Sequence, residues 1–173
     1  MRVLESSRQS LSFEALCQKV TQSKKRKPFM GTLLALDPGE TTGVAIFQEG
    51  KLVEAFQEST KEIKSALITI APIIKRFGFD AIVIEEYRVY AWKVKEHAWS
   101  DLHTSRLIGA IELLCAIHEI PLHKQSAQIA KQFCTDKKLK DWNLWLKGQV
   151  HSRDAIRHGC YFILFGKYTG DKT

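Results

Sequence analysis

Three short apolar segments follow one another between residues 32 and 59, and their spacing restricts the fold more than any other feature of the chain. They are residues 32–37 (TLLALD), 43–48 (GVAIFQ) and 51–59 (KLVEAFQES), and turn-forming residues separate them. Runs this close together leave no room for helices between them and are typical of an antiparallel meander. We therefore expect the sheet to begin with three sequential antiparallel strands.

Beyond this meander, apolar residues recur every three or four positions, which is the period of a helix. We expect this helix over residues 59–78, with Ser59 and Glu62 forming a capping box at its start. The next apolar run, residues 80–86 (DAIVIEE), predicts a strand, and a strand reached through a helix lies parallel to the first one. Further segments predict a helix buried on most sides (100–119), a strand (120–124) and two more helices (126–134 and 150–165). This order predicts an α/β fold with a five-stranded mixed sheet flanked by helices.

The size and composition of the chain favour one main domain. Its 173 residues, 45% of them hydrophobic, suffice for a single substantial core. We divide the chain into an N-terminal extension, residues 1–30, with a short amphipathic helix and a basic linker (SKKRKP), and a main domain, residues 31–173. The chain shows neither an apolar run long enough for a membrane span nor the apolar core of a signal peptide. We expect a soluble cytoplasmic protein with no membrane partner, of bacterial, phage or organelle origin.

Charge and cysteine content narrow the class of function. A net charge of +7 and a pI near 9.3 favour polyanionic partners, nucleic acid above all, although many small basic proteins bind none specifically. The four cysteines are far apart and form no C-x-x-C pair. This spacing argues against a zinc knuckle and against a disulfide framework.

Three acids occupy the ends of predicted elements. Asp37 closes the first strand, Glu85 closes the fourth, and Asp154 falls in the first turn of the last helix. Neighbouring strands lie about 5 Å apart, and the last helix can bring its acid to the same edge of the sheet. Three converging carboxylates repel one another unless a divalent cation neutralises them, and hard oxygen ligands predict Mg²⁺ or Mn²⁺.

Basic side chains near these acids extend the candidate site. His151 precedes Asp154 by three residues on the same helical face, as a fourth ligand or a general base. Lys124, Lys131 and Lys147 are candidates for contacts to phosphate.

Each acid also has an ordinary structural explanation. Asp37 can cap its own Pro-Gly turn, Glu85 can be a solvated strand end, and Asp154 can be a favourable acid near a helix start. Their joint occurrence in this order favours a site. We choose Glu85 over Glu86 because adjacent strand residues point to opposite faces, and Glu85 shares its face with the strand's alternate apolar residues.

Three motifs together resemble the RuvC-like Holliday junction resolvases of the ribonuclease H-like superfamily: LALDPGETTGVAIF, DAIVIEEY and HSRDAIRHG. The resemblance covers most of residues 31–165. It implies that the catalytic residues Asp37, Glu85, His151 and Asp154 bind two Mg²⁺ ions, with Mn²⁺ as a substitute. It also implies hydrolysis of four-way junction DNA to 5′-phosphate ends by a homodimer, because a symmetric junction needs two cuts.

The chain departs from that family at two points. Many members carry a second aspartate where this chain has His151. Some members carry an aromatic wedge three residues past the strand glutamate, where this chain has Arg88 flanked by Tyr87 and Tyr90, our further candidates for DNA binding.

Three other functions stay open or are set aside. A flap, replication-fork or RNA–DNA hybrid nuclease of the same fold, and a non-catalytic DNA-binding module, are the alternatives to a junction resolvase. The segment LDPGETTG also resembles the phosphate-binding turn of sugar kinases and actin-like ATPases. Those enzymes need two lobes to enclose a nucleotide, and this chain is long enough for one.

Overall fold

The computed structural model describes residues 11–23, 27–87 and 102–167. Within these ranges a five-stranded sheet has the order β3-β2-β1-β4-β5. Its strands are β1 (Leu33–Asp37), β2 (Thr41–Gln48), β3 (Lys51–Ser59), β4 (Ala81–Glu85) and β5 (Leu122–Gln125). Strand β2 is antiparallel to both β1 and β3, whereas β4 is parallel to β1 and β5 is parallel to β4. The expected meander and the expected α/β fold with a mixed sheet are both confirmed.

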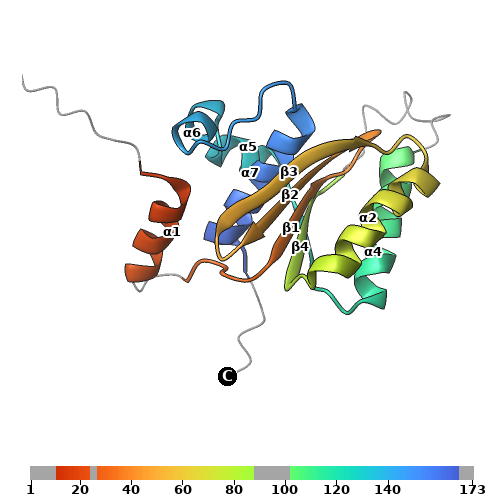
Figure 1. The fold of residues 1–173 in the computed structure, drawn as a ribbon, viewed down its shortest axis with the longest axis horizontal. Coiled ribbons are helices and arrows are strands. Elements are labelled where there is room, and N and C mark those ends of the chain that lie inside the picture. The colour runs from red at the N-terminus through yellow and green to blue at the C-terminus, as the bar shows by residue number, and fades with distance from the viewer. Residues whose placement is uncertain (1–10, 24–26, 88–101, 168–173) are drawn as a thin grey trace, which may run out of the picture.

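Helices cover both faces of this sheet (Figure 1). The described helices are α1 (Phe13–Gln22), α2 (Ile63–Phe77), α4 (His103–Ile117), α5 (Ala127–Phe133), α6 (Asp136–Asp141) and α7 (Val150–Phe165). Helices α2 and α4 lie on one face, and α7 lies on the other with α1 and α5 beside it. None of the helices in the described ranges is long and apolar enough to cross a membrane.

The central strand β1 contributes to both hydrophobic layers. Leu33 and Ala35 pack in the α7 layer, and Leu34 and Leu36 pack in the layer of α2 and α4. All four side chains are fully buried. A strand covered on both faces is apolar at every position rather than at every second one, which explains the continuous run that ends at Asp37.

Two glycines allow α7 to lie directly on the sheet. A Cβ atom at Gly43 of β2 would clash with the carbonyl oxygen of His151, and one at Gly159 of α7 would clash with the ring of Phe47. Because neither position carries a side chain, the start of α7 lies against β2. This close approach holds His151 and Asp154 beside the end of β1.

The N-terminal helix packs on the α7 layer. Phe13 of α1 is buried, and its ring centroid lies 5.2 Å from that of Trp142. Phe29 is buried as well, and its backbone N–H donates to the carbonyl oxygen of Ile163. The expected short amphipathic helix is confirmed, while a domain boundary at residue 30 stays a prediction.

Two details of the expected helices are wrong. The N-cap of α2 is Glu62, which makes no side-chain capping bond, and Ser59 remains in β3, so no capping box forms. Helix α4 is buried on one face only, since Leu113 and Ile117 are 62% and 63% exposed. The sequence of α4 is apolar enough to suggest burial on most sides, but the sheet covers only one face of this helix.

Candidate active site

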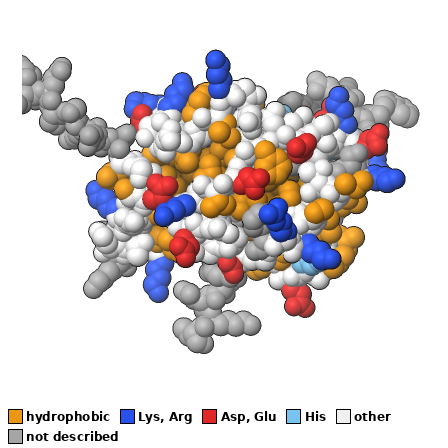
Figure 2. All heavy atoms as spheres, viewed as in Figure 1, with side chains coloured by type: hydrophobic (Ala, Val, Ile, Leu, Met, Phe, Trp, Pro, Cys, Tyr) orange, Lys and Arg blue, Asp and Glu red, His pale blue; other side chains and the backbone are white. Residues whose placement is uncertain are grey.

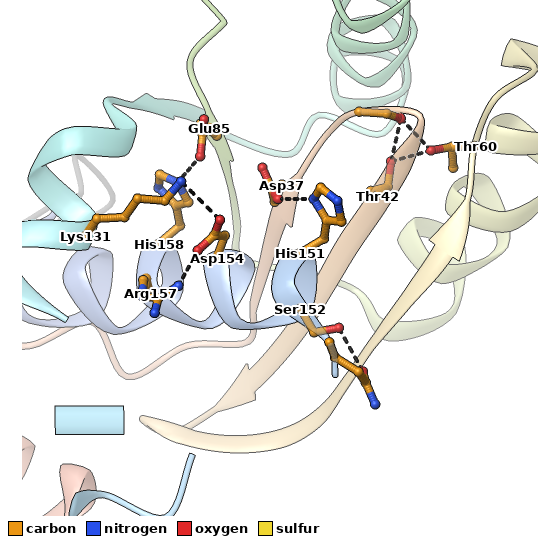
Figure 3. Close-up of polar contacts among 12 residues, drawn as sticks. Asp37, Thr42, Thr60, Glu85, Lys131, His151, Ser152, Asp154, Arg157 and His158 are labelled. Carbon is orange, nitrogen blue, oxygen red and sulfur yellow. Dashed lines mark hydrogen bonds and ion pairs between the residues drawn. The ribbon is translucent and has the colours of Figure 1, made fainter. Parts of the chain in front are cut away.

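The carboxyl ends of β1 and β4 meet at one edge of the sheet. Leu36 pairs with Ile84 across the two parallel strands, so the next residues, Asp37 and Glu85, lie side by side. Helix α7 crosses the sheet there and presents a row of polar side chains to both acids (Figure 3). The structure thus brings together the acids that the sequence placed at separate strand ends.

Asp37 is nearly buried and contacts His151. Its Oδ2 lies 2.8 Å from Nδ1 of His151. Burial, together with the charges of Glu85 and Asp154, raises the pKa of Asp37 to about 6, and the hydrogen bond from His151 keeps the increase from being larger. The three carboxylates are therefore close enough to repel one another.

Asp154 lies between two cations. It forms an ion pair with Arg157 one turn further along α7, and its Oδ2 lies 3.0 Å from Nζ of Lys131 on α5. Arg157 also binds Asp136 and donates from Nε to the carbonyl oxygen of Cys134. Asp154 lies just past the first turn of α7, not within it as expected.

Glu85 contacts a residue that the sequence interpretation missed. Its Oε2 lies 3.1 Å from Nε2 of His158, whose ring is completely buried. The signal was available, because His151, Asp154 and His158 have the spacing of residues on one helical face. Arg157 was missed as well, since no pattern in the sequence pairs it with Asp136 and Cys134.

Lys131 is close to all three acids. Burial lowers the pKa of Lys131, but the hydrogen bond to Asp154 and the charges of Asp154, Glu85 and Asp37 outweigh burial and raise it above the ordinary 10.5. Its ammonium group is therefore charged at neutral pH, and about half of the side chain is exposed. A charged, accessible group beside the acids suits contact with a phosphate.

The remaining candidates for DNA contact lie in different surroundings. Lys124 forms an ion pair with Glu112 of α4, and Lys147 is exposed in the connection before α7. Tyr87 is half-buried and packs against the α2 and α4 layer. Arg88 and Tyr90 lie outside the described residues.

The donor atoms at this edge suit a hard divalent cation. Asp37, Glu85 and Asp154 supply carboxylate oxygens, and their mutual repulsion is relieved by positive charge. Across the described ranges, however, no three His, Cys, Asp or Glu side chains are gathered closely enough to hold an ion as they stand. Each acid instead contacts a basic group (Figure 3). Binding of an ion therefore requires side chains such as His151 or Lys131 to turn away from their present partners.

Known proteins resemble this chain in structure but not in sequence. No protein-family model matches the chain, and no curated protein matches it in sequence. A structure of T. thermophilus RuvC in complex with Holliday junction substrate matches with a TM-score of 0.62 and 16% identity, covering 79% of this chain and 97% of that one. The yeast mitochondrial Holliday junction resolvase Ydc2 matches with a TM-score of 0.55 and 11% identity, covering 90% of this chain and 86% of that one.

These matches identify the class of the fold and the group of folds within that class. A mixed five-stranded sheet in this order, flanked by helices, is a ribonuclease H-like arrangement. Within that class, the chain has the RuvC-like fold. The expected fold is confirmed, and the site geometry rather than the likeness carries the functional argument.

Proposed function

We propose that this chain is a metal-dependent endonuclease that cleaves branched DNA, Holliday junctions in particular. The observation that carries the proposal is the convergence of Asp37, Glu85 and Asp154 at one edge of a RuvC-like fold, where their charges raise the pKa of Asp37. Three mutually repelling acids are costly for folding alone, whereas a divalent cation relieves that cost.

The residues that would hold two Mg²⁺ ions, or Mn²⁺ in their place, are Asp37, Glu85, His151 and Asp154. Bound divalent ions would lower the pKa of a water and stabilise the leaving 3′ oxygen of a phosphodiester, so that the products would carry 5′-phosphate ends. Lys131 supplies a charged group for the phosphate beside these acids. His151 is 43% exposed, so its ring can reach an incoming ligand.

The DNA would lie across the open edge of the sheet. Lys and Arg side chains are scattered over the face in Figure 2 rather than gathered in one patch, which suits a partner that contacts the protein at several points. Contacts from Lys124, Lys147, Tyr87, Arg88 and Tyr90 are part of the proposal, as are a homodimer and a cytoplasmic location. A homodimer supplies the two cuts that a symmetric junction needs.

Two alternatives differ in substrate or in chemistry. A flap, fork or RNA–DNA hybrid nuclease would use the same acids on another substrate. A non-catalytic DNA-binding module would not benefit from them, because clustered negative charge repels phosphate. The acids therefore favour an enzyme.

Labelled four-way junctions, flaps, forks and hybrids, each incubated with Mg²⁺, Mn²⁺ or EDTA, test the proposal directly. We expect paired cuts in junctions with either metal and none with EDTA. Asp154→Asn should lower cleavage at least about 100-fold and leave junction binding intact, whereas Glu54→Gln, which removes an exposed acid on β3, should change neither. Undiminished cleavage by Asp154→Asn contradicts the assignment. A strictly monomeric protein in sedimentation would favour the other substrates.

A further inference from the structure

His158 is held at both ring nitrogens inside the protein. Nε2 lies 3.1 Å from Oε2 of Glu85, and Nδ1 lies 3.0 Å from Nε2 of Gln125. The side chain is 0% exposed, so water cannot replace either contact. Rotation of the ring would leave two buried polar groups unpaired, which is costly. The ring is therefore fixed in orientation.

The contacts of Gln125 define which nitrogen of His158 carries the proton. The amide nitrogen of Gln125 lies 3.3 Å from the backbone carbonyl oxygen of His158, as well as near its Nδ1 atom. A carbonyl oxygen only accepts, so the NH₂ group of Gln125 must face it. The same NH₂ group then donates to Nδ1, which leaves the proton of a neutral ring on Nε2, and Nε2–H donates to Glu85.

Rigid elements support all three residues. Glu85 and Gln125 are the last residues of β4 and β5 and pair in register, and the N–H of Glu86 donates to the carbonyl oxygen of Gln125 at 2.9 Å. His158 lies in the middle of α7, which packs on the sheet. The contact engages Oε2 of Glu85 and not Oε1.

From this geometry we propose that His158 is a positioning residue for Glu85: as the Nε2–H tautomer held by Gln125, it binds Oε2 and fixes the Glu85 carboxylate at the sheet edge that also carries Asp37 and Asp154. This inference rests on the proposed function and assigns His158 and Gln125 a role in divalent cation binding. Hydrogen bonds that orient a ligating carboxylate typically change metal affinity by about 10- to 100-fold.

A space-filling role for the same histidine predicts a different response to substitution. His158→Leu keeps an apolar side chain of similar size and removes the donor, whereas His158→Gln retains an N–H donor that can reach Glu85. If His158 only fills space, the leucine variant performs at least as well as the glutamine variant. If it positions Glu85, glutamine rescues and leucine does not.

Titration of Mn²⁺ into the full chain without DNA, by calorimetry, provides a readout independent of cleavage. We expect His158→Leu to weaken Mn²⁺ binding about 10- to 100-fold and His158→Gln to stay within about threefold of wild type. The matched control is His123→Leu on β5, a partly buried histidine whose Nε2 has no hydrogen-bond partner in the described part of the chain. That control should bind Mn²⁺ like wild type. Equal Mn²⁺ affinity in wild type and His158→Leu overturns the inference.

Nitrogen-15 NMR of the His158 ring in the wild-type protein tests the inference even where the leucine variant fails to fold. We expect the Nε2–H tautomer, and a shift to the other tautomer or loss of the preference in Gln125→Leu. An Nδ1–H tautomer in wild type overturns the inference. Failure of the proposed function looks different: wild type then binds no divalent cation and cuts no DNA, whatever the tautomer of His158.

Discussion

Two histidine–carboxylate pairs lie next to each other at this edge of the sheet, and they differ mainly in exposure. Asp37 with His151 and Glu85 with His158 both join the end of a strand to α7, and the two histidines are seven residues apart on that helix. The His151 side chain is 43% exposed, and the His158 side chain is 0% exposed. We call Asp37 with His151 the open pair and Glu85 with His158 the closed pair. An exposed histidine–carboxylate pair can bind an incoming ligand, whereas a buried pair can fix the orientation of its carboxylate.

The difference comes from where α7 meets the sheet. His151 is the second residue of the helix, and the absence of a side chain at Gly43 lets the backbone there approach β2. His158 lies two turns further along, under the end of β5, where Gln125 covers its second nitrogen. The position along one helix therefore decides which of the two histidines is exposed to solvent.

The largest expected effect follows from removing either carboxylate. Asp37→Asn and Glu85→Gln should each lower junction cleavage at least about 100-fold and preserve junction binding measured in Ca²⁺, because each removes a ligand charge without changing size. Single-turnover cleavage is the measurement. If Asp37→Asn lowered cleavage and Glu85→Gln did not, the closed pair would not be part of the active site.

The second prediction concerns how the ionisation of Asp37 makes the stability of the protein depend on pH. The pKa of Asp37 rises from 3.8 to about 6 on folding, so its ionisation opposes folding increasingly between these two values and fully above pH 6, and it has almost no effect below pH 3.8. Asp37→Asn should therefore raise the free energy of unfolding at pH 8 by up to about 3 kcal/mol and leave it unchanged near pH 3.5. Urea unfolding at the two pH values tests this.

Divalent cations provide the internal control for that prediction. Mg²⁺ should stabilise the wild-type protein at pH 8 and stabilise Asp37→Asn less, because the variant lacks the charge that the cation neutralises. A stabilisation by Asp37→Asn that is equal at both pH values would contradict the assigned cause.

A third prediction separates the pairs by geometry. Gly43→Ala places a methyl group against the backbone of His151, so it should cost about 1–3 kcal/mol of unfolding free energy and disturb the open pair more than the closed one. Gly109→Ala is the control, because a Cβ there in α4 meets no atom within 4 Å of the described chain. That control should gain about 0.5–1 kcal/mol.

Ring NMR signals of the two histidines report the outcome of the glycine substitution. We expect the His151 signals to shift strongly in Gly43→Ala and those of His158 to stay close to wild type. Equal shifts in both would mean that α7 moves as a whole and that the two pairs are not independent.

The smallest expected effect is the change in protein stability when His151 of the open pair is removed. His151→Ala should change the free energy of unfolding by less than about 1 kcal/mol, because exposed ion pairs contribute little. His158→Ala should cost about 2–4 kcal/mol, since it opens a buried space and removes the ring N–H that donates to Oε2 of Glu85. Thermal unfolding of both variants measures this difference. Similar losses of stability in the two variants would mean that the two histidines do not differ in their contribution to the fold.

Most of the fold could be predicted because each prediction rested on local pattern. Apolar runs separated by short turns predicted β1 to β3, and a helix between two apolar runs predicted that β4 is parallel to β1. The candidate acids Asp37 and Glu85 were found because polar residues at the ends of apolar strands are conspicuous. The capping box failed because β3 continues through Ser59.

The sequence alone was sufficient for the order of the elements, the strand pairing and the acids at strand ends, since hydrophobic periodicity and strand connection depend on neighbours along the chain. It was not sufficient for the partners of those acids. Whether His158 or Arg157 is buried, and against which carboxylate, depends on how α7 crosses the sheet and on contacts between residues 21 and 73 positions apart. Hydrogen bonds and burial across such distances exist only after packing, so the difference between the open and the closed histidine became visible only in the folded molecule.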